Sequence, residues 1–177
     1  MIKKNYNKTA IEKKNKAFKN WNKYNFIYKK VSEILYEKVN ELKSYFKNIL
    51  ILTSDLSETV SQIERIKHEN LVFVSQYNFF EDNYLKNSKV FKVFSYFDNL
   101  PFSENKFDLI ICNLNFHNIL DKKDYLNNLN SILNEGGLLI CNFFGENSLV
   151  ELRRSLILTD EELYNGSFLR IQKNITM

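Results

Sequence analysis

The sequence predicts an α/β protein built on one doubly wound, mainly parallel sheet, with a helical cap before its first strand. Short apolar runs alternate four times with segments of helical periodicity, a pattern typical of a parallel sheet covered on both faces. Hydrophobic residues make up 44% of the 177 residues, which is enough for one domain with a substantial core.

The chain is predicted to start with a basic, loose arm over residues 1–25, which are polar and rich in Lys and Asn. The first 47 residues hold 13 Lys and 4 Glu, whereas the rest of the chain is net acidic. Such an arm can meet nucleic acid, an acidic protein or a membrane surface. No arginine and no ordered aromatic surface accompanies these lysines. We therefore interpret the arm as a solvated face, and nucleic-acid binding has no supporting motif.

A cap helix is predicted over 26–47, and a strand directly after it. The cap helix shows apolar residues at helical spacing, namely Ile27, Val31, Ile34, Leu35, Val39, Leu42 and Phe46. The run NILILTS then starts the sheet core at residue 48. Asp55 followed by Glu58 indicates the beginning of a helix that reaches about Lys67.

The remaining elements follow in the same alternation. Strands are predicted at 70–75, 89–96 and 107–112, with a weaker helical signal at 79–87. A helix is predicted over 121–135, with Asp121 as its cap and with Gly136 and Gly137 ending it in a left-handed turn. GLLICNFF, 137–144, predicts a fifth strand, and 145–177 a C-terminal helical segment. Residues 26–177 thus form one predicted domain with a sheet core over 48–144.

Several classes of protein are disfavoured by what the sequence lacks. It has no apolar run of about 18 residues for a membrane span and no secretory h-region. Two cysteines do not make a disulfide framework, which favours a cytoplasmic location. We interpret Cys112 and Cys141, near the ends of neighbouring strands, as core side chains rather than a redox pair. No metal-spaced Cys/His cluster is present, and no metal site is predicted.

A ligand crevice is predicted beyond the carboxyl ends of the strands, where strand order reverses. The candidate cofactor-binding residues at these ends are Thr53, Ser54, Asp55, Ser75, Gln76, Phe97, Asp98 and Asn113. His117, in the loop after the fourth strand, is a candidate general base. We favour the alternative for His117, a half-buried side chain that lines the loop.

The segment LPFSENKFDLIICNLNFHNILDKKDYLNNLNSILNEGGLLICNFFGENSLVELRRSL, 100–156, resembles the class I S-adenosylmethionine-dependent methyltransferases. The resemblance is carried by Leu100-Pro101-Phe102, Phe107-Asp108-Leu109, His117 in an apolar loop, and Gly136-Gly137 before the fifth strand. The nearest branch holds the malonyl-carrier-protein O-methyltransferases of biotin synthesis and the complex I assembly factor that hydroxylates an arginine. The resemblance implies a Rossmann-like sheet and S-adenosylmethionine as cofactor.

The cofactor determinants implied by this resemblance are altered. The family carries a glycine-rich turn after the first strand, because the backbone must approach the cofactor closely, but this chain reads LTSDLSE there. The second strand ends in Ser75 and Gln76 instead of a carboxylate for the ribose hydroxyls. At the third strand, Tyr96 stands where an Asp toward the adenine is expected, with Asp98 two residues later. Three changes together predict a degenerate site.

Three functional hypotheses follow. The first is a pseudo-enzyme that uses the fold as a binding or assembly module. The second is an active methyltransferase acting on a carrier-protein-bound carboxylate or a related acceptor. The third is a nucleic-acid- or membrane-associated module that uses the basic arm. The family's final antiparallel strand pair has no counterpart in this sequence, so we expect a protein partner or self-association to complete the sheet edge.

Overall fold

The computed structural model describes residues 25–42, 45–54, 65–76, 90–119, 121–145, 148 and 150–164. The chain divides into two compact units, Met1–Asn142 and Phe143–Met177. The first unit holds the whole sheet, and the second holds helix α6 (Val150–Tyr164). The predicted arm up to residue 24, the start of the helix at Asp55 and the helix at 79–87 lie outside the described residues.

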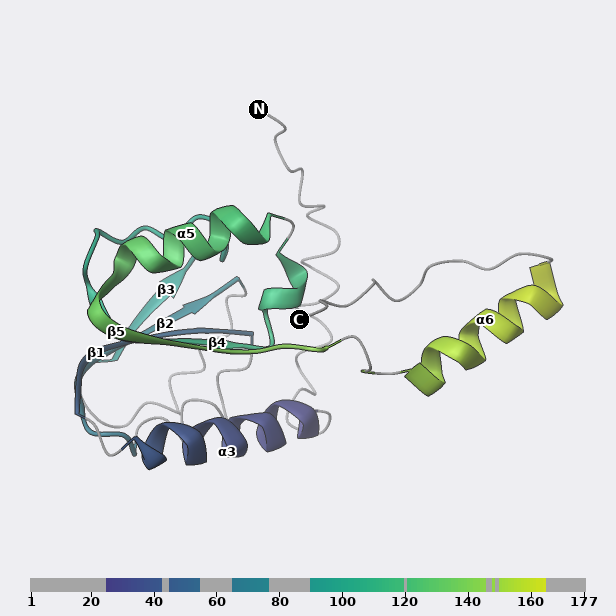
Figure 1. Ribbon diagram of the computed structural model, residues 1–177, viewed down its shortest axis with the longest axis horizontal. Helices are drawn as coiled ribbons and strands as arrows, with labels where there is room; N and C mark the ends of the chain where they lie inside the picture. Colours follow the sequence, from purple (N-terminus) through teal and green to yellow (C-terminus); the bar gives the residue numbers. More distant parts are fainter. Residues whose placement is uncertain are drawn as a thin grey trace. The chain divides into compact units, whose positions relative to one another are not determined.

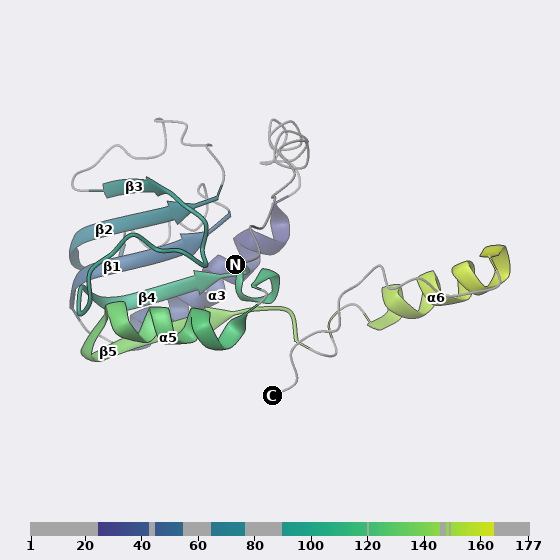
Figure 2. The same ribbon diagram turned by 90° about the horizontal axis from the view of Figure 1, so that it is seen from above.

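The sheet has five parallel strands in the order β3-β2-β1-β4-β5, as Figure 2 shows. Its strands are β1 (Phe46–Thr53), β2 (His68–Ser75), β3 (Val90–Phe94), β4 (Phe107–Asn113) and β5 (Leu133–Asn142). Each neighbouring pair is parallel, so this order confirms the predicted doubly wound α/β fold. The third strand is shorter than the predicted 89–96.

The middle parts of the central strands are apolar because helices cover both faces of the sheet. Figure 1 shows α3 (Phe26–Glu41) on one face and α5 (Lys122–Ile132) on the other. On the α3 face, Leu35 and Val39 pack against a cluster of buried strand residues that includes Ile49 and Ile111. On the α5 face, Tyr125 and Leu129 are buried. A strand between two covered faces reads as one continuous apolar run, as ILIL in β1 does.

The cap helix is shorter than predicted. It ends at Glu41, and Phe46 is not the last residue of its stripe but the first residue of β1. The Phe46 N–H donates to the Lys67 carbonyl at 3.2 Å, and Phe46 pairs with His68 across the strands. Phe46 therefore belongs to the sheet, because its pairing with β2 outweighs its fit to the helical period of the preceding residues. Of the predicted stripe, Leu35 and Val39 are buried, whereas Ile27, Ile34 and Leu42 are exposed.

The boundary between α5 and β5 also differs from the prediction. The helix ends at Ile132 instead of residue 135, and β5 begins at Leu133 instead of residue 137. The last carbonyls of the helix are taken by the chain that enters β4: Lys106 N–H donates to Ile132 O at 2.8 Å. Gly136 then lies within β5 with φ of +74°, beside an irregularity in the pairing with β4.

Hydrogen bonds at the amino end of the sheet join four strands, β2, β1, β4 and β5. One Asp108 carboxylate oxygen accepts from the Asn48 backbone N–H at 2.8 Å. The other accepts from Asn134 Nδ2 at 2.6 Å. The Asn48 side chain accepts from Asn70 Nδ2 at 2.8 Å. The Asp of the Phe107-Asp108-Leu109 motif is thus a structural residue at the end of the sheet opposite the predicted crevice.

Candidate functional site

The candidate site lies at the carboxyl ends of β1 and β4. These neighbouring strands are where the order of the sheet reverses, the position at which doubly wound sheets bind ligands. The pairing brings three polar residues into one row across the strand ends: Thr53 is opposite Asn113, and Asn113 is opposite Asn142. Thr53 and Asn113 are fully buried. Polar side chains therefore replace the apolar core at this edge.

The loop after β4 is tied to this edge by side-chain amides. Asn113 Nδ2 donates to Ser32 Oγ of α3 at 3.1 Å, and Asn115 Nδ2 donates to the Leu52 carbonyl of β1 at 2.9 Å. Leu114, with φ of +50°, donates its N–H to Asn142 Oδ1 at 2.7 Å. A non-glycine residue held in the left-handed region costs free energy, which the surrounding hydrogen bonds must offset. The loop is thus positioned by β1 and β5 together.

Two buried amide atoms at this edge have no hydrogen-bond partner among the described residues. They are Asn115 Oδ1, an acceptor, and Asn142 Nδ2, a donor. Nearly all buried polar atoms in proteins are hydrogen-bonded, and each exception calls for a water, an ion or a ligand. The pair therefore offers one acceptor and one donor to a polar group placed at the reversal point of the sheet.

The ends of β2 and β3 contribute the other candidate residues. Ser75 is fully buried, and its carbonyl accepts from the Ser95 N–H at 3.2 Å. Gln76 and Asp98 are half-buried, and Phe97 is 2% exposed. This side of the site thus has one buried aromatic side chain, Phe97, and one carboxylate, Asp98, after the third strand.

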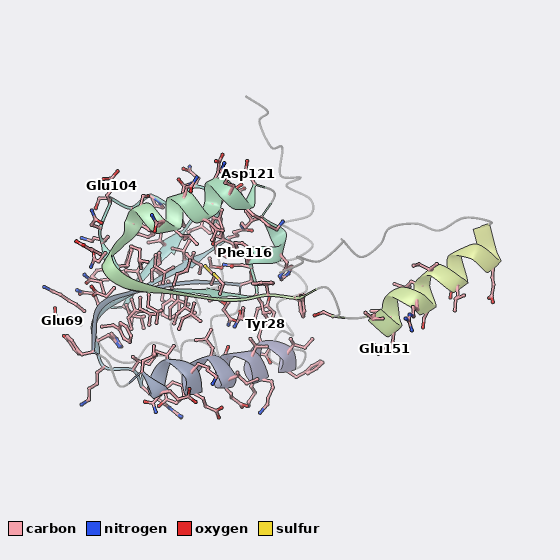
Figure 3. The ribbon with its side chains drawn as sticks, viewed as in Figure 1. Tyr28, Glu69, Glu104, Phe116, Asp121 and Glu151 are labelled. Atoms are coloured by element: carbon pink, nitrogen blue, oxygen red, sulfur yellow. The ribbon has the colours of Figure 1, made fainter. Side chains whose placement is uncertain are left out.

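His117 lies in η2 (Phe116–Asn118), the short 3-10 helix of the loop after β4. Its side chain is half-buried, and burial together with the nearby Lys122 ammonium lowers the pKa of the imidazole below its usual value of 6.5. The ring is therefore neutral near pH 7 and has one nitrogen able to accept a proton. Its neighbour Phe116 contacts Tyr125 at 6.0 Å between ring centroids, on the α5 side of the sheet (Figure 3).

The structure brings some of the predicted site residues together and separates others. Thr53 and Asn113 are cross-strand partners, with Ser54 directly beyond β1. Ser75 belongs to β2, on the other side of β1 from Asn113. Asp55 lies outside the described residues. Sequence reasoning missed Ser32 and Asn142. The parallel strand ends could have indicated Asn142, whereas Ser32 depends on how α3 packs.

Two further properties concern the described part of the chain. Within it, no group of three or more His, Cys, Asp or Glu residues is arranged to hold a metal ion. No helix in it is both long enough and apolar enough to cross a membrane.

Several curated relatives match part of the chain, and they include the following three. A protein of Rickettsia prowazekii named as a methyltransferase is 44% identical over 69 residues. Malonyl-[acyl-carrier protein] O-methyltransferase 2 of Ilyobacter polytropus is 37% identical over 70 residues. The human mitochondrial arginine-hydroxylase NDUFAF5 is 40% identical over 67 residues. Each match covers 38–39% of this chain and only 19–30% of the relative, so the chain spans less than a third of each relative's length.

Solved structures share the fold. An S-adenosylmethionine-dependent methyltransferase from Methanococcus maripaludis matches 93% of this chain and 75% of its own, with a TM-score of 0.57 and 16% identity. A chain from the complex of the Haloferax volcanii Trm112 methyltransferase activator with a methyltransferase covers 55% of this chain and 45% of its own, with a TM-score of 0.50 and 17% identity. At these identities, the likeness concerns the fold.

The family model described as "Methyltransferase domain" matches residues 39–141, which is more than half of the chain and includes all five strands except the last residue of β5. The strand order and the reversal between β1 and β4 agree with this match. The chain belongs to the methyltransferase domain family.

Proposed function

We propose that this chain is a methyltransferase-fold binding module, a pseudo-enzyme whose S-adenosylmethionine site is degenerate. The observation that carries the proposal is the absence of a carboxylate from the two residues at the carboxyl end of β2. Ser75 there is fully buried and Gln76 is half-buried, and both side chains are neutral. The family resemblance implies a carboxylate at this point, to accept hydrogen bonds from both ribose hydroxyls. Neutral hydrogen bonds are roughly half as strong as charge-assisted ones.

The other described candidates do not replace this carboxylate. Asp98 is the one carboxylate among them, and it follows the third strand. One carboxylate there offers the adenine amino group an acceptor but leaves the ribose hydroxyls to Ser75 and Gln76. The described residues therefore fit S-adenosylmethionine poorly, and no methyl-transfer step is assigned to them.

A specific observation favours a second candidate, an active methyltransferase acting on a carrier-protein-bound carboxylate or a related acceptor. Asn115 Oδ1 and Asn142 Nδ2 are buried and lack a partner among the described residues, at the edge where the family holds its cofactor. They could accept from and donate to the amino-acid end of S-adenosylmethionine. His117, neutral near pH 7, would lie in the adjoining loop as a general base.

A binding module acts through a partner, and we propose that the partner pairs with the edge of strand β5. Among the described strands, β5 pairs only with β4, so its other edge is available for a further strand. The stretch from Leu138 to Asn142 has no lysine or proline to block such pairing. A protein partner or a second copy of the chain would complete the sheet there. We place the protein in the cytoplasm, where the reducing conditions favour the free thiols that both cysteines have in the structure.

The test is equilibrium dialysis of the folded chain with methyl-labelled S-adenosylmethionine, followed by a transfer assay on malonyl-carrier protein. The proposal predicts neither saturable retention nor labelled acceptor. The active alternative predicts both, and it predicts that Asn115→Leu, which removes the orphaned acceptor, lowers retention at least tenfold. Asn127→Leu, on the exposed face of α5, is the matched control. Retention without transfer would leave a cofactor-binding protein that is not a methyltransferase for this acceptor.

A further inference from the structure

The two cysteines of the chain are direct neighbours in the sheet. Cys112 on β4 is the register partner of Cys141 on β5. Paired residues of parallel strands point to the same face and are separated by the strand spacing, about 4.8 Å. Cys112 Sγ lies 3.6 Å from the Tyr125 hydroxyl of α5, so this shared face is the α5 side. The chain has no other cysteine, which makes the pair its whole thiol content.

The two thiols differ in exposure and in acidity. Cys112 is fully buried, whereas Cys141 is partly exposed. The hydrogen bond to Cys141 and burial raise the pKa of the Cys112 thiol. The same hydrogen bond lowers the pKa of Cys141, although burial opposes it. Cys141 is therefore the more acidic of the two thiols. A reactive cysteine is an accessible one with thiolate character, and Cys141 is nearer to both conditions than Cys112.

In place of the sequence-based interpretation as core side chains, we propose that Cys112 and Cys141 form a reversible dithiol–disulfide pair that is oxidised by hydrogen peroxide, with Cys141 as the reactive thiol and Cys112 as the resolving thiol. In the first step, the Cys141 sulfur attacks one peroxide oxygen, the O–O bond breaks, and Cys141 sulfenic acid and water result. In the second step, Cys112 sulfur attacks the Cys141 sulfur. The S–O bond breaks, the Cys112 proton leaves with the hydroxyl as water, and the S–S bond forms.

The geometry predicts that this disulfide forms readily and is also readily reduced. Disulfides need Cα atoms about 4.4–6.8 Å apart, which neighbouring parallel strands satisfy, but their Cβ atoms lie about 3.5–4.5 Å apart, closer than the strand spacing. The strand ends must therefore approach by several tenths of an ångström, and strained disulfides are the more reducible ones. The proposal is independent of cofactor binding, since it depends only on the pairing of β4 with β5.

The site lies next to the polar row at the strand ends. Cys112 precedes Asn113, and Cys141 precedes Asn142, whose side chain holds the loop through Leu114. Drawing the two strands together would therefore act directly on the loop that carries His117. Oxidation would change the shape of this edge of the sheet. It would therefore alter the binding of any ligand or partner that contacts the edge.

The experiment treats the folded, reduced full chain with a small excess of hydrogen peroxide and follows it by intact mass and peptide mapping. We expect free thiols to fall from two per chain to none, with loss of two hydrogen atoms, a Cys112–Cys141 linked peptide, no covalent dimer, and full recovery with dithiothreitol. Thiols that stay free, disulfide-linked dimers, or oxidation of Cys141 to sulfinic acid without a disulfide would each overturn the proposal.

Two variants separate the roles of the thiols. Cys112→Ser should leave a Cys141 sulfenic acid that dimedone traps, whereas Cys141→Ser should show no dimedone adduct, because Cys112 is buried. Equal labelling of both variants would contradict the assignment of the reactive thiol. Circular dichroism establishes that each variant is folded. Should either variant fail to fold, the peptide map of the wild-type chain still decides whether the disulfide forms.

Discussion

At the scale of single residues, Asp108 has the clearest structural role. Its carboxylate accepts from the Asn48 backbone N–H and the Asn134 side chain, and so joins β4 to both of its neighbours. Hydrogen bonds to charged groups contribute about 1.5–3 kcal/mol each, and an unsatisfied buried donor costs a further 1–3 kcal/mol. This position therefore stabilises the end of the sheet away from the candidate site.

Replacing Asp108 by Ala is predicted to lower the free energy of unfolding by about 2–3 kcal/mol, because the half-buried donors lose a charged acceptor. Urea denaturation measures the change. Glu104→Ala is the control, since Glu104 is exposed in the turn before β4, and its effect should stay within about 0.5 kcal/mol. Equal changes in the free energy of unfolding for the two substitutions would contradict the structural role of Asp108.

His117 predicts how stability depends on pH. Burial and Lys122 hold its pKa below 6.5 in the folded chain. The unfolded state then binds a proton at a higher pH than the folded state. The contribution of neutral His117 to the free energy of unfolding is therefore fully present above pH 6.5, and it is lost as the pH falls through the pKa of the folded state. His117→Gln should flatten this part of the curve of unfolding free energy against pH. A slope that survives the substitution would assign it to another group.

At the scale of elements, the pattern of apolar residues was enough to locate every described strand. It was not enough to locate the residues at which each strand begins and ends. The run ILIL could be placed in a covered strand because a short continuous apolar run, bounded by polar residues, is typical of a strand between two helical layers. The ends of α3 and α5 could not be placed, because tertiary hydrogen bonds decide them. Phe46 pairs with β2, and Lys106 takes the Ile132 carbonyl. Such bonds leave no periodic signal in the sequence.

The left-handed conformation of Gly136 in β5 predicts the effect of replacing this glycine on stability. Its φ of +74° is the left-handed conformation, which costs residues with a Cβ about 1–2 kcal/mol, while the space around it is open. Gly136→Ala should therefore lower the free energy of unfolding by about that amount through the backbone alone. Gly145→Ala is the matched control, because Gly145 also has open space and needs no positive φ. Similar denaturation midpoints for the two variants would contradict this reading of β5.

At the scale of the whole molecule, the fold was predictable and the state of its site only partly so. Alternating strands and helices with right-handed crossovers lead to the observed sheet order. That order also indicates where a ligand binds, because β1 and β4 are the strands at which it reverses. The positions of Asn115 and Asn142 could not be predicted, since they depend on a left-handed Leu114 whose N–H donates to the Asn142 side chain.

The central claim is that the family fold has been kept while its cofactor site is degenerate. The neutral end of β2 supports the claim, and the two orphaned amide atoms are the feature that most favours the active alternative. These two observations make opposite predictions about a single quantity, the affinity for S-adenosylmethionine.

The measurement that tests the claim most directly is a thermal shift titration with S-adenosylmethionine and S-adenosylhomocysteine. A ligand at a hundred times its Kd stabilises the folded state by about 2.7 kcal/mol. For a chain of this size, each kcal/mol is worth about 2–4 °C, so an intact site would raise Tm by about 5–11 °C. We predict no saturable shift at millimolar ligand from a cooperatively unfolding sample. A saturable rise of that size would contradict the claim and establish a working cofactor site.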